Sequence, residues 1–405
     1  MLIFNKVLRI QTNSLIKRIF FKLKIYIFPR KTLVNKKTPY KKIKYPKKTH
    51  SFAGYYDRSP FYADKYLFLA TDCEDYLLRN NVASIFVYDN RLNTYSKISD
   101  VQAWNFQQAS QQQWLENDKV IFNDVTNGNP VCKICNLEGE IIKTFDFNIG
   151  HISKDRKATV YDYSKLYEYE HEYGYANISS NSMSLLSIID LDSGKTLKNF
   201  SHEDIAKTYP VNSYFENTII WVNHPKFNKS GSKLLFVVRS KHNNIQRSDL
   251  FVFDFASEKL FCALMWNDWK LGGHHPVWYD ENEILMNLCL SEESDMCFIR
   301  FSDFYKGYTV IAPDIKGSGH PTISPNKKFL ITDTYPNREG IQNLRLIDLA
   351  SNKEISLGEF FSPPRFRKRF GTDLHPRWIN NSLICFDSTM DKNRGVYLID
   401  ISSLI

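Results

Sequence analysis

Short apolar runs that end in a polar residue and a turn recur along most of the chain. The copies are SIFVYD (84–89), VCKICN (131–136), LLSIID (185–190), DLFVFD (249–254), DMCFIR (295–300), NLRLID (343–348) and GVYLID (395–400). Their last residues lie 46 to 64 positions apart. The runs are rich in Ile, Val, Phe and Tyr and are bounded by turn residues, which is typical of β-strands. Only the segment 203–208 suggests a short helix.

A second element precedes each of these runs. Four copies begin with His-Pro and continue with an apolar residue three positions after the histidine, a polar turn and an apolar strand. These copies start at His224, His275, His320 and His375, and degenerate copies start at Tyr55, Gln111 and Ile149. Each unit predicts three strands with room for a fourth. Four antiparallel strands with a period of about 50 residues are typical of a β-propeller blade.

Seven such units account for the chain from about residue 50 to its end. We therefore predict an all-β domain over residues 49–405, a seven-bladed β-propeller. The last unit stops at Ile405, directly after its third strand. We expect its outer strand to be absent or to be supplied by the segment before residue 50, which would close the ring by pairing the two ends of the chain.

The first 48 residues differ in charge from the rest. They hold 15 Lys or Arg and no Asp or Glu, which exceeds the net charge of +9 for the whole chain and leaves −6 on residues 49–405. Apolar and cationic residues alternate without a run of about 18 uncharged residues, so a spanning helix is not expected. We predict a basic, partly helical, amphipathic arm that binds an anionic membrane surface. A solvated tail and, less well, an organellar targeting peptide also fit.

The remaining composition limits compartment and partners. Seven cysteines are scattered without a regular disulfide spacing, which favours a reducing compartment. With the basic arm, this predicts a cytoplasmic protein that is peripheral at the inner membrane. The mildly acidic body gives no reason to expect a nucleic-acid partner.

The four His-Pro histidines hold equivalent positions in four successive blades. Because the first strand of each propeller blade lines the central channel, we expect these imidazoles to meet at one mouth of that channel. Neutral imidazoles are metal ligands and general bases near neutral pH. Together with oxygen ligands they would suit a divalent ion, zinc or manganese. The alternative is that they only pack between blades.

Arginine and polar side chains in the loops at the same mouth predict a partner that is an acidic or hydroxyl-rich glycan, because Arg pairs with carboxylates in a bidentate manner. Tyr55 shares the histidine register, and we predict it, with Arg338, to be catalytic. The substrate-binding candidates are Arg58, Arg239, Asn337, Arg394 and the basic stretch PRFRKRF (364–370), whose central residues are Arg365, Phe366, Arg367 and Lys368.

The blades HPTISPNKKFLIT and HPKFNKSGSKLLFVV resemble those of TolB-like propellers, and the histidine-rich mouth is similar to the oligogalacturonate lyase branch of that group. That resemblance implies manganese bound by histidines and a glutamine, and β-elimination of uronate-containing sugars. It places metal ligands at His275, His320, His375 and Gln111 and a candidate base at His224. The opening GYYDRSP (54–60) resembles propellers associated with bacterial surface-polysaccharide synthesis, some of them labelled glycosyltransferases.

Three functions stay open at this point. The main hypothesis is a membrane-associated, glycan-processing protein of surface-polysaccharide (capsule or O-antigen) synthesis, in which the arm and the opening motif have a role. The second is a metal-assisted uronate lyase, in which His224 removes a proton beside a neutralised carboxylate. The third is a non-catalytic propeller scaffold, since a fold does not fix a function.

Overall fold

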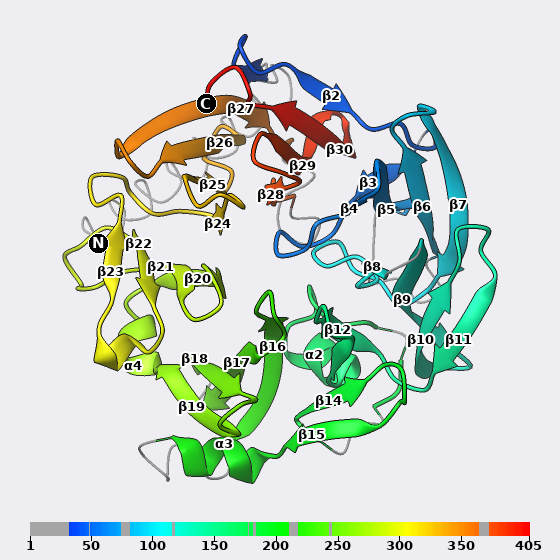
Figure 1. Cartoon of the computed structure of the whole chain (residues 1–405), viewed down its shortest axis with the longest axis vertical. Helices are drawn as coiled ribbons and strands as arrows, with labels where there is room; N and C mark the ends of the chain where they lie inside the picture. Colours follow the sequence, from blue (N-terminus) through cyan, green and yellow to red (C-terminus); the bar gives the residue numbers. More distant parts are fainter. Residues whose placement is uncertain are drawn as a thin grey trace, which may run out of the picture.

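Seven antiparallel sheets surround a central axis (Figure 1), so the predicted all-β, seven-bladed propeller is confirmed. The computed structural model describes residues 32–47, 49–73, 82–115, 118–176, 178–180, 184–209, 218–242, 245–363 and 372–405. In five of the sheets the first strand lies nearest the axis and the last strand lies at the rim, while in the other two a strand from the start of the chain is added at the rim.

The blades follow one another in chain order. Blade 1 contains β3 (His50–Phe52), β4 (Phe61–Tyr62), β5 (Lys65–Thr71), β6 (Ala83–Asp89) and β7 (Thr94–Val101). Blade 2 contains β8 (Gln113–Leu115), β9 (Lys119–Thr126), β10 (Asn129–Cys135) and β11 (Ile141–Phe145). Blade 3 contains β12 (Ile149–Ile152), β13 (Lys157–Val160), β14 (Leu186–Asp190) and β15 (Thr196–Phe200).

The second half of the ring repeats this plan. Blade 4 contains β16 (Ile219–Phe227), β17 (Lys233–His242), β18 (Ile245–Asp254) and β19 (Lys259–Leu264). Blade 5 contains β20 (Gly273–Trp278), β21 (Ile284–Leu288), β22 (Cys297–Phe301) and β23 (Thr309–Ile311). Blade 6 contains β24 (Thr322–Ile323), β25 (Phe329–Asp333), β26 (Ile341–Asp348) and β27 (Lys353–Phe361), and blade 7 contains β28 (Arg377–Trp378), β29 (Leu383–Asp391) and β30 (Asn393–Asp400).

Short helices connect some of these strands. They are α2 (Tyr163–Tyr169), α3 (His202–Thr208), α4 (Trp266–Trp269) and the 3₁₀ helix η2 (Phe304–Lys306). Helix α3 confirms the helix expected over 203–208, and Ser201 caps it by accepting a hydrogen bond from the backbone N–H of Asp204. In the part of the chain that the structure describes, no helix has the length and apolar character needed to cross a membrane.

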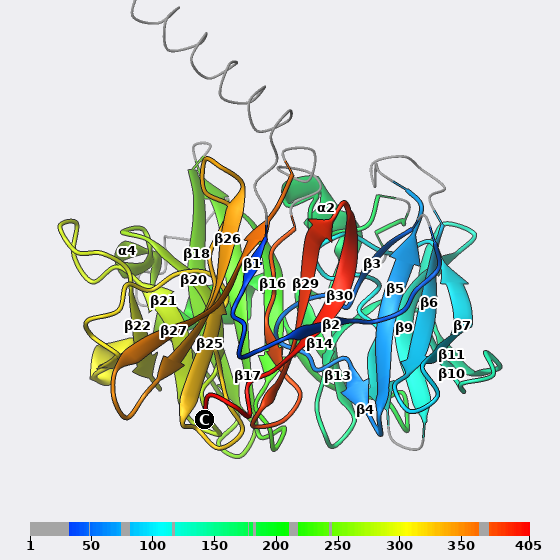
Figure 2. The same ribbon diagram turned by 90° about the horizontal axis from the view of Figure 1, so that it is seen from above.

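The ring is closed by the chain before residue 50, as one of the two sequence-based alternatives predicts. Strand β2 (Tyr40–Lys42) pairs with β30 and forms the outer strand of blade 7, while β1 (Leu33–Val34) pairs with β27 at the rim of blade 6 (Figures 1 and 2). Residues 33–34 and 40–42 of the expected basic arm therefore belong to the sheets of the propeller. Residues 1–31 of that arm lie outside the described residues.

The core lies between neighbouring blades, which explains why the strands are continuous apolar runs. In β17, Leu234 and Phe236 pack in a cluster with blade 3, whereas Leu235 and Val237 pack in a cluster with blade 5. All four side chains are at most 1% exposed. Because successive side chains of a strand point to opposite faces, a strand between two blades has both faces buried.

Candidate functional site

A backbone irregularity directs the predicted histidines out of their blades. The residues His224, His275 and His375 have φ values of 54°, 61° and 45°, in the left-handed region that non-glycine residues rarely adopt. The pairing register also shifts around them, between Asn223 and Lys226 in blade 4 and between His274 and Val277 in blade 5. Such bulges re-aim a side chain and are frequent beside functional sites.

The four histidines surround one tyrosine on the loop between β3 and β4, which reaches toward the axis in Figure 1. The ring of Tyr55 stacks on His224, with centroids 5.1 Å apart and planes 13° apart. The same ring makes edge contacts with His375, His320 and His275 at centroid distances of 4.9, 6.1 and 6.4 Å. The predicted convergence of the four imidazoles in the channel is thus observed.

A buried carboxylate orients two of these histidines. Asp333, only 1% exposed, ends β25 and faces the Nδ1 of His320 at 2.9 Å. Its two oxygens also accept the backbone N–H groups of His320, at 2.8 Å, and of His375, at 3.1 Å. Because a carboxylate accepts the Nδ1 proton of His320, the Nε2 of that ring carries a free lone pair, which is the arrangement found behind many metal-bound histidines.

Backbone carbonyls set the tautomer of two further rings. The Nδ1 of His275 lies 2.9 Å from the carbonyl oxygen of Gly319, and the Nδ1 of His375 lies 3.3 Å from that of Gly54. A carbonyl can only accept, so each Nδ1 donates and each Nε2 is left as an acceptor. The Nε2 of His375 is buried and has no hydrogen-bond partner among the described residues.

The imidazoles of His224, His275 and His375 are electrically neutral at physiological pH. Burial lowers the pKa of His224, His275 and His375 well below the ordinary value, and neighbouring cations and imidazoles act in the same direction. Metal ions bind the neutral form of histidine, so these rings are ready to act as ligands or as bases without first losing a proton.

One carboxylate completes a metal-binding group that sequence reasoning missed. His320, Asp373 and His375 each offer a ligand atom, and these atoms all lie within 4.8 Å of one another. Burial raises the pKa of Asp373, and a bound cation would offset that cost. Two nitrogens and one oxygen suit a zinc or manganese ion, so the residues fit the predicted divalent metal. The strand alternation gives no signal for Asp373, because His375, two residues later, has a left-handed backbone and does not lie along an extended chain.

The other two predicted ligands stand outside this group. The ring of His275 lies beside that of His320, with centroids 3.9 Å apart, but His275 is not part of the three-residue group. The side-chain oxygen of Gln111 accepts a hydrogen bond from Arg58, and its amide nitrogen donates to Gln108. The amide of Gln111 is therefore engaged on both sides.

A cavity of about 380 Å³ opens beside the imidazoles, between blades 4 and 5. His224, His275, Arg239 and Tyr335 are among its lining residues. Arg239 is held by a carboxylate at the end of α2, because its Nε lies 2.9 Å from an oxygen of Glu170. The cavity thus combines imidazoles, a fixed guanidinium and phenols, a set that suits an anionic, hydroxylated ligand.

Arg394, another predicted substrate-binding residue, is buried near Asp373 of the metal-binding group. Its side chain is 1% exposed, and the guanidinium lies 4.8 and 5.1 Å from the ring centroids of Phe52 and Phe106. None of its three guanidinium nitrogens has a hydrogen-bond partner among the described residues. An orphaned buried guanidinium beside Asp373 favours an anionic ligand at this position.

The remaining predicted residues lie elsewhere. Arg58 lines a different cavity, away from the cleft of His224 and His275. Asn337 uses its side-chain oxygen to accept backbone N–H groups of its own turn, from Glu339 and Ile341. Arg338 is exposed on that turn. The basic stretch 364–370, with Arg365, Phe366, Arg367 and Lys368, lies outside the described residues.

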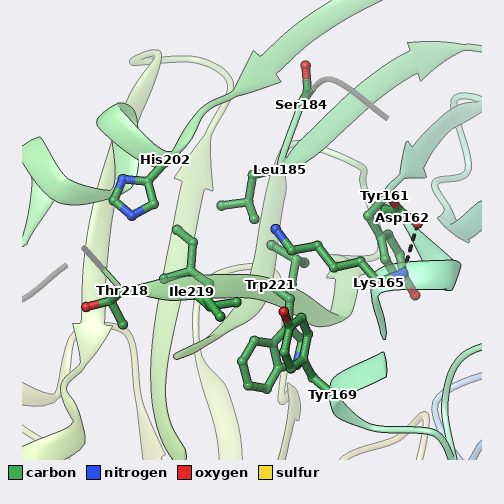
Figure 3. A pocket seen from close by; sticks show the side chains of 12 residues that line it. Tyr161, Asp162, Lys165, Tyr169, Ser184, Leu185, His202, Thr218, Ile219 and Trp221 are labelled. Carbon is green, nitrogen blue, oxygen red and sulfur yellow. Dashed lines mark hydrogen bonds between the residues drawn. The ribbon is translucent and has the colours of Figure 1, made fainter. Parts of the chain in front are cut away.

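A further hollow of about 330 Å³ lies between blades 3 and 4, among α2, β14, α3 and β16 (Figure 3). Lys165, His202 and the stacked pair of Tyr169 and Trp221 line it, the two rings with centroids 4.7 Å apart. It brings together none of the residues predicted for the site, so it does not compete with the channel mouth as the functional centre.

Comparisons with known proteins support the fold. No family model and no curated protein matches the chain. It is similar to an oligogalacturonate lyase in complex with manganese, at 12% identity and a TM-score of 0.62, covering 92% of this chain and 96% of that chain. It is also similar to an oligogalacturonate lyase from Vibrio parahaemolyticus, at 11% identity and a TM-score of 0.59, covering 92% and 97%.

A third similar structure is the β-propeller domain of the Trilobed protease from Pyrococcus furiosus, at 12% identity and a TM-score of 0.51, covering 88% of this chain and 95% of that domain. These identities show a shared fold and no more. For the fold, the predicted resemblance to oligogalacturonate lyases is confirmed.

Proposed function

We propose that the chain is a metal-assisted lyase that cleaves uronate-containing glycans by β-elimination. One observation carries the proposal. His320, Asp373 and His375 present ligand atoms within 4.8 Å of one another, while His275, with its ring 3.9 Å from that of His320, stands outside the group with its Nε2 left as an acceptor. The channel mouth thus combines a candidate metal centre with an adjacent base. That two similar folds are oligogalacturonate lyases, one of them in complex with manganese, supports this proposal.

The chemistry needs three functions from the site. His320, Asp373 and His375 would hold a divalent ion, and its positive charge would neutralise the substrate carboxylate and so acidify the proton on the neighbouring carbon. The Nε2 of His275 takes that proton, and the carbonyl of Gly319 stabilises the resulting imidazolium through Nδ1–H. The electrons form a carbon–carbon double bond as the bond to the glycosidic oxygen breaks.

The leaving oxygen must gain a proton. Tyr335 lines the same cavity, and its ring centroid lies 6.3 Å from that of His275. Tyr335 is 44% exposed at this cavity, and its phenol carries a proton at neutral pH that it can donate. We assign this donation to Tyr335. Tyr55, predicted as catalytic, is 3% exposed at the centre of the imidazoles, and we assign it the role of separating and orienting them.

His224, the base expected from the resemblance, also lines the cavity, but its nearest ring partners are tyrosines. It stacks on Tyr55 and makes an edge contact with Tyr173, with centroids 5.0 Å apart. Because His275 is the imidazole beside the metal group, we place the proton abstraction on His275. To His224 and Arg239, which line the same cavity, we assign the binding of the neighbouring sugar and its carboxylate.

The comparisons favour this lyase hypothesis over the glycosyltransferase-like one, which none of the structures named above supports. The predicted role in surface-polysaccharide synthesis stays a prediction, because none of the comparisons bears on it. The predicted membrane attachment also stays a prediction, because residues 1–31 lie outside the described part of the chain.

The proposal is tested by incubating the full chain with oligogalacturonate and manganese and recording the ultraviolet absorbance of the unsaturated product. We expect an increase with the wild-type protein, a loss of about 10²-fold or more for His275→Gln, and a smaller loss for His224→Gln. His202→Gln, in the hollow of Figure 3, is the matched control and should keep full activity. The proposal is wrong if metal-loaded wild-type protein produces no unsaturated sugar from oligogalacturonate or from other polyuronates.

A further inference from the structure

The inner strands have a second end, opposite the imidazoles. In blade 4, Trp221 pairs with Arg239 toward the first mouth, whereas Phe227 pairs with Leu234 beside the turn that ends the strand. A cavity of about 220 Å³ lies at this second end, and Phe227 lines it. We call it the far-mouth cavity, defined by Tyr56, Asp57, Arg58, Lys226, Trp278 and Trp378. It shares no lining residue with the cavity beside His275.

Charged side chains that are themselves nearly buried are concentrated in the wall of the far-mouth cavity. The side chains of Asp57, Lys226 and Arg58 are 5%, 3% and 13% exposed. The ammonium of Lys226 lies 3.6 Å from Asp57 and donates to the hydroxyl of Tyr56, at 3.1 Å, and to the carbonyl of Pro276, at 2.8 Å. Two cations therefore share one carboxylate, which leaves about one uncompensated positive charge.

The neighbouring titratable groups do not supply the missing negative charge. Arg377, also in the wall, is paired with Asp387 at 3.3 Å, so that pair is neutral. Burial lowers the pKa of His151 to about 3, and Arg58 acts in the same direction, so this imidazole is uncharged. Burial lowers the pKa of Lys226 only to about 8, against the opposing effect of Asp57, so its ammonium stays mostly protonated at pH 7.

Two polar atoms in this cavity lack hydrogen bonds. The Oδ1 of Asp57 and the Nε of Arg58 are closed to solvent and have no hydrogen-bond partner among the described residues. They lie 3.8 Å from each other, which is close enough for charge attraction and too far for a hydrogen bond. Buried polar atoms are normally satisfied, so an acceptor for Arg58 and a donor for Asp57 are both missing.

The walls of the cavity are aromatic. The indole N–H of Trp278 donates to the carbonyl of Lys226, at 2.8 Å, and that of Trp378 donates to the carbonyl of Thr322, at 3.3 Å. Since both N–H groups are used, what the indoles offer to a ligand is ring surface. Ring faces of tryptophan suit the apolar face of a flat or cyclic ligand.

We propose that the far-mouth cavity binds a small acidic sugar, a single sugar ring that carries one negative charge, separately from the metal centre. The anionic group compensates Arg58 and Lys226, a hydroxyl donates to the free oxygen of Asp57, and the ring lies against Trp278 and Trp378. Tyr56 separates the two sites, because its ring packs 5.0 Å from that of His320 while its hydroxyl faces Lys226.

The proposal is tested by calorimetric titration of D-galacturonate into the metal-free full chain, with galactose and acetate as probes for the ring and for the charge alone. We expect one site for galacturonate and at least tenfold weaker binding of galactose and of acetate. Arg58→Gln should weaken galacturonate binding about tenfold or more, and Lys226→Met should do the same. Arg91→Gln, whose side chain is 77% exposed, is the matched control and should bind as the wild type does.

A variant in the cavity beside His275 separates this proposal from the proposed lyase function. Arg239→Gln, which removes the cation that we assign to the substrate carboxylate there, should leave galacturonate binding unchanged. Binding that is lost in Arg239→Gln and kept in Arg58→Gln would place the acid in the cavity beside His275 and overturn the proposal. Absence of any galacturonate binding to a folded protein would also overturn it, and so would acetate that binds as tightly as galacturonate. None of these outcomes depends on lyase activity.

Discussion

Replacement of Asp333 by Asn should weaken metal binding without removing a metal ligand. Asp333 accepts the Nδ1 proton of His320 and the backbone N–H groups of His320 and His375, and it is 1% exposed. Asparagine keeps the shape but loses the charge and replaces one acceptor oxygen by a donor. One of the three donors then faces another donor, and the ring of His320 loses its fixed tautomer.

The size of this effect follows from the position of Asp333 behind the ligand. Loss of such an outer partner typically costs about 10- to 100-fold in metal affinity, which corresponds to about 1.4–2.7 kcal/mol. Manganese titration by calorimetry should show this decrease for Asp333→Asn. The exposed Asp314→Asn is the matched control and should bind manganese as the wild type does. A folded Asp333→Asn protein with manganese affinity within twofold of the wild type would refute the reasoning.

Three further results are expected. Ile43→Ala should lower the free energy of unfolding, measured in urea, by about 2–5 kcal/mol, because Ile43 directly follows the closing strand β2 and is 1% exposed. Leu33→Ala, at a side chain that is 61% exposed, should change the stability little. Equal effects of the two substitutions would contradict the closure of the ring by β2. Burial raises the pKa of Asp249 to about 7, whereas the same carboxyl in the unfolded chain loses its proton near pH 4. The contribution of Asp249 to the stability of the folded protein should therefore fall as the pH rises from about 4 to 7. The decrease in unfolding free energy over this pH range should be smaller in Asp249→Asn than in the wild type. Parallel curves of stability against pH for the two proteins would contradict this prediction. Deletion of residues 1–31 should abolish binding to vesicles containing phosphatidylserine, and unchanged binding would exclude the predicted membrane arm.

Most of the fold can be predicted from the sequence because each blade repeats one strand pattern. Runs such as 250–253 are apolar throughout because both faces of the strand pack on a neighbouring blade, as Leu234 and Leu235 do in β17. The pairing partner of β2 could be narrowed to the last blade, since the final unit lacked an outer strand. The pairing of β1 with β27 at the rim of blade 6 could not be predicted, because a strand of two residues has no recognisable sequence pattern.

The site could be predicted only in part. Equivalent positions in successive blades place His224, His275, His320 and His375 around one channel, and the structure brings them around Tyr55. Which imidazoles form the metal group depends on side-chain directions at the bulges, and these do not follow from position in a repeat.

Two carboxylates and two polar side chains show the same limit. Asp333 and Asp373 lie far apart in the sequence and approach the same histidines only in the folded propeller, so their roles could not be predicted from the sequence. Arg58 was expected at the imidazole mouth, but the loop between β3 and β4 continues past Tyr55 to the other end of the channel. There Arg58 engages Gln111 and lines the far-mouth cavity.

The central claim is that imidazoles from separate blades form a metal centre at one mouth of the channel. The most direct test is an anomalous difference map from crystals of the full chain soaked in manganese. We predict one peak within bonding distance of His320, Asp373 and His375, and its loss in Asp373→Asn. A map with no peak there, or with its only channel peak at another group, would contradict the claim.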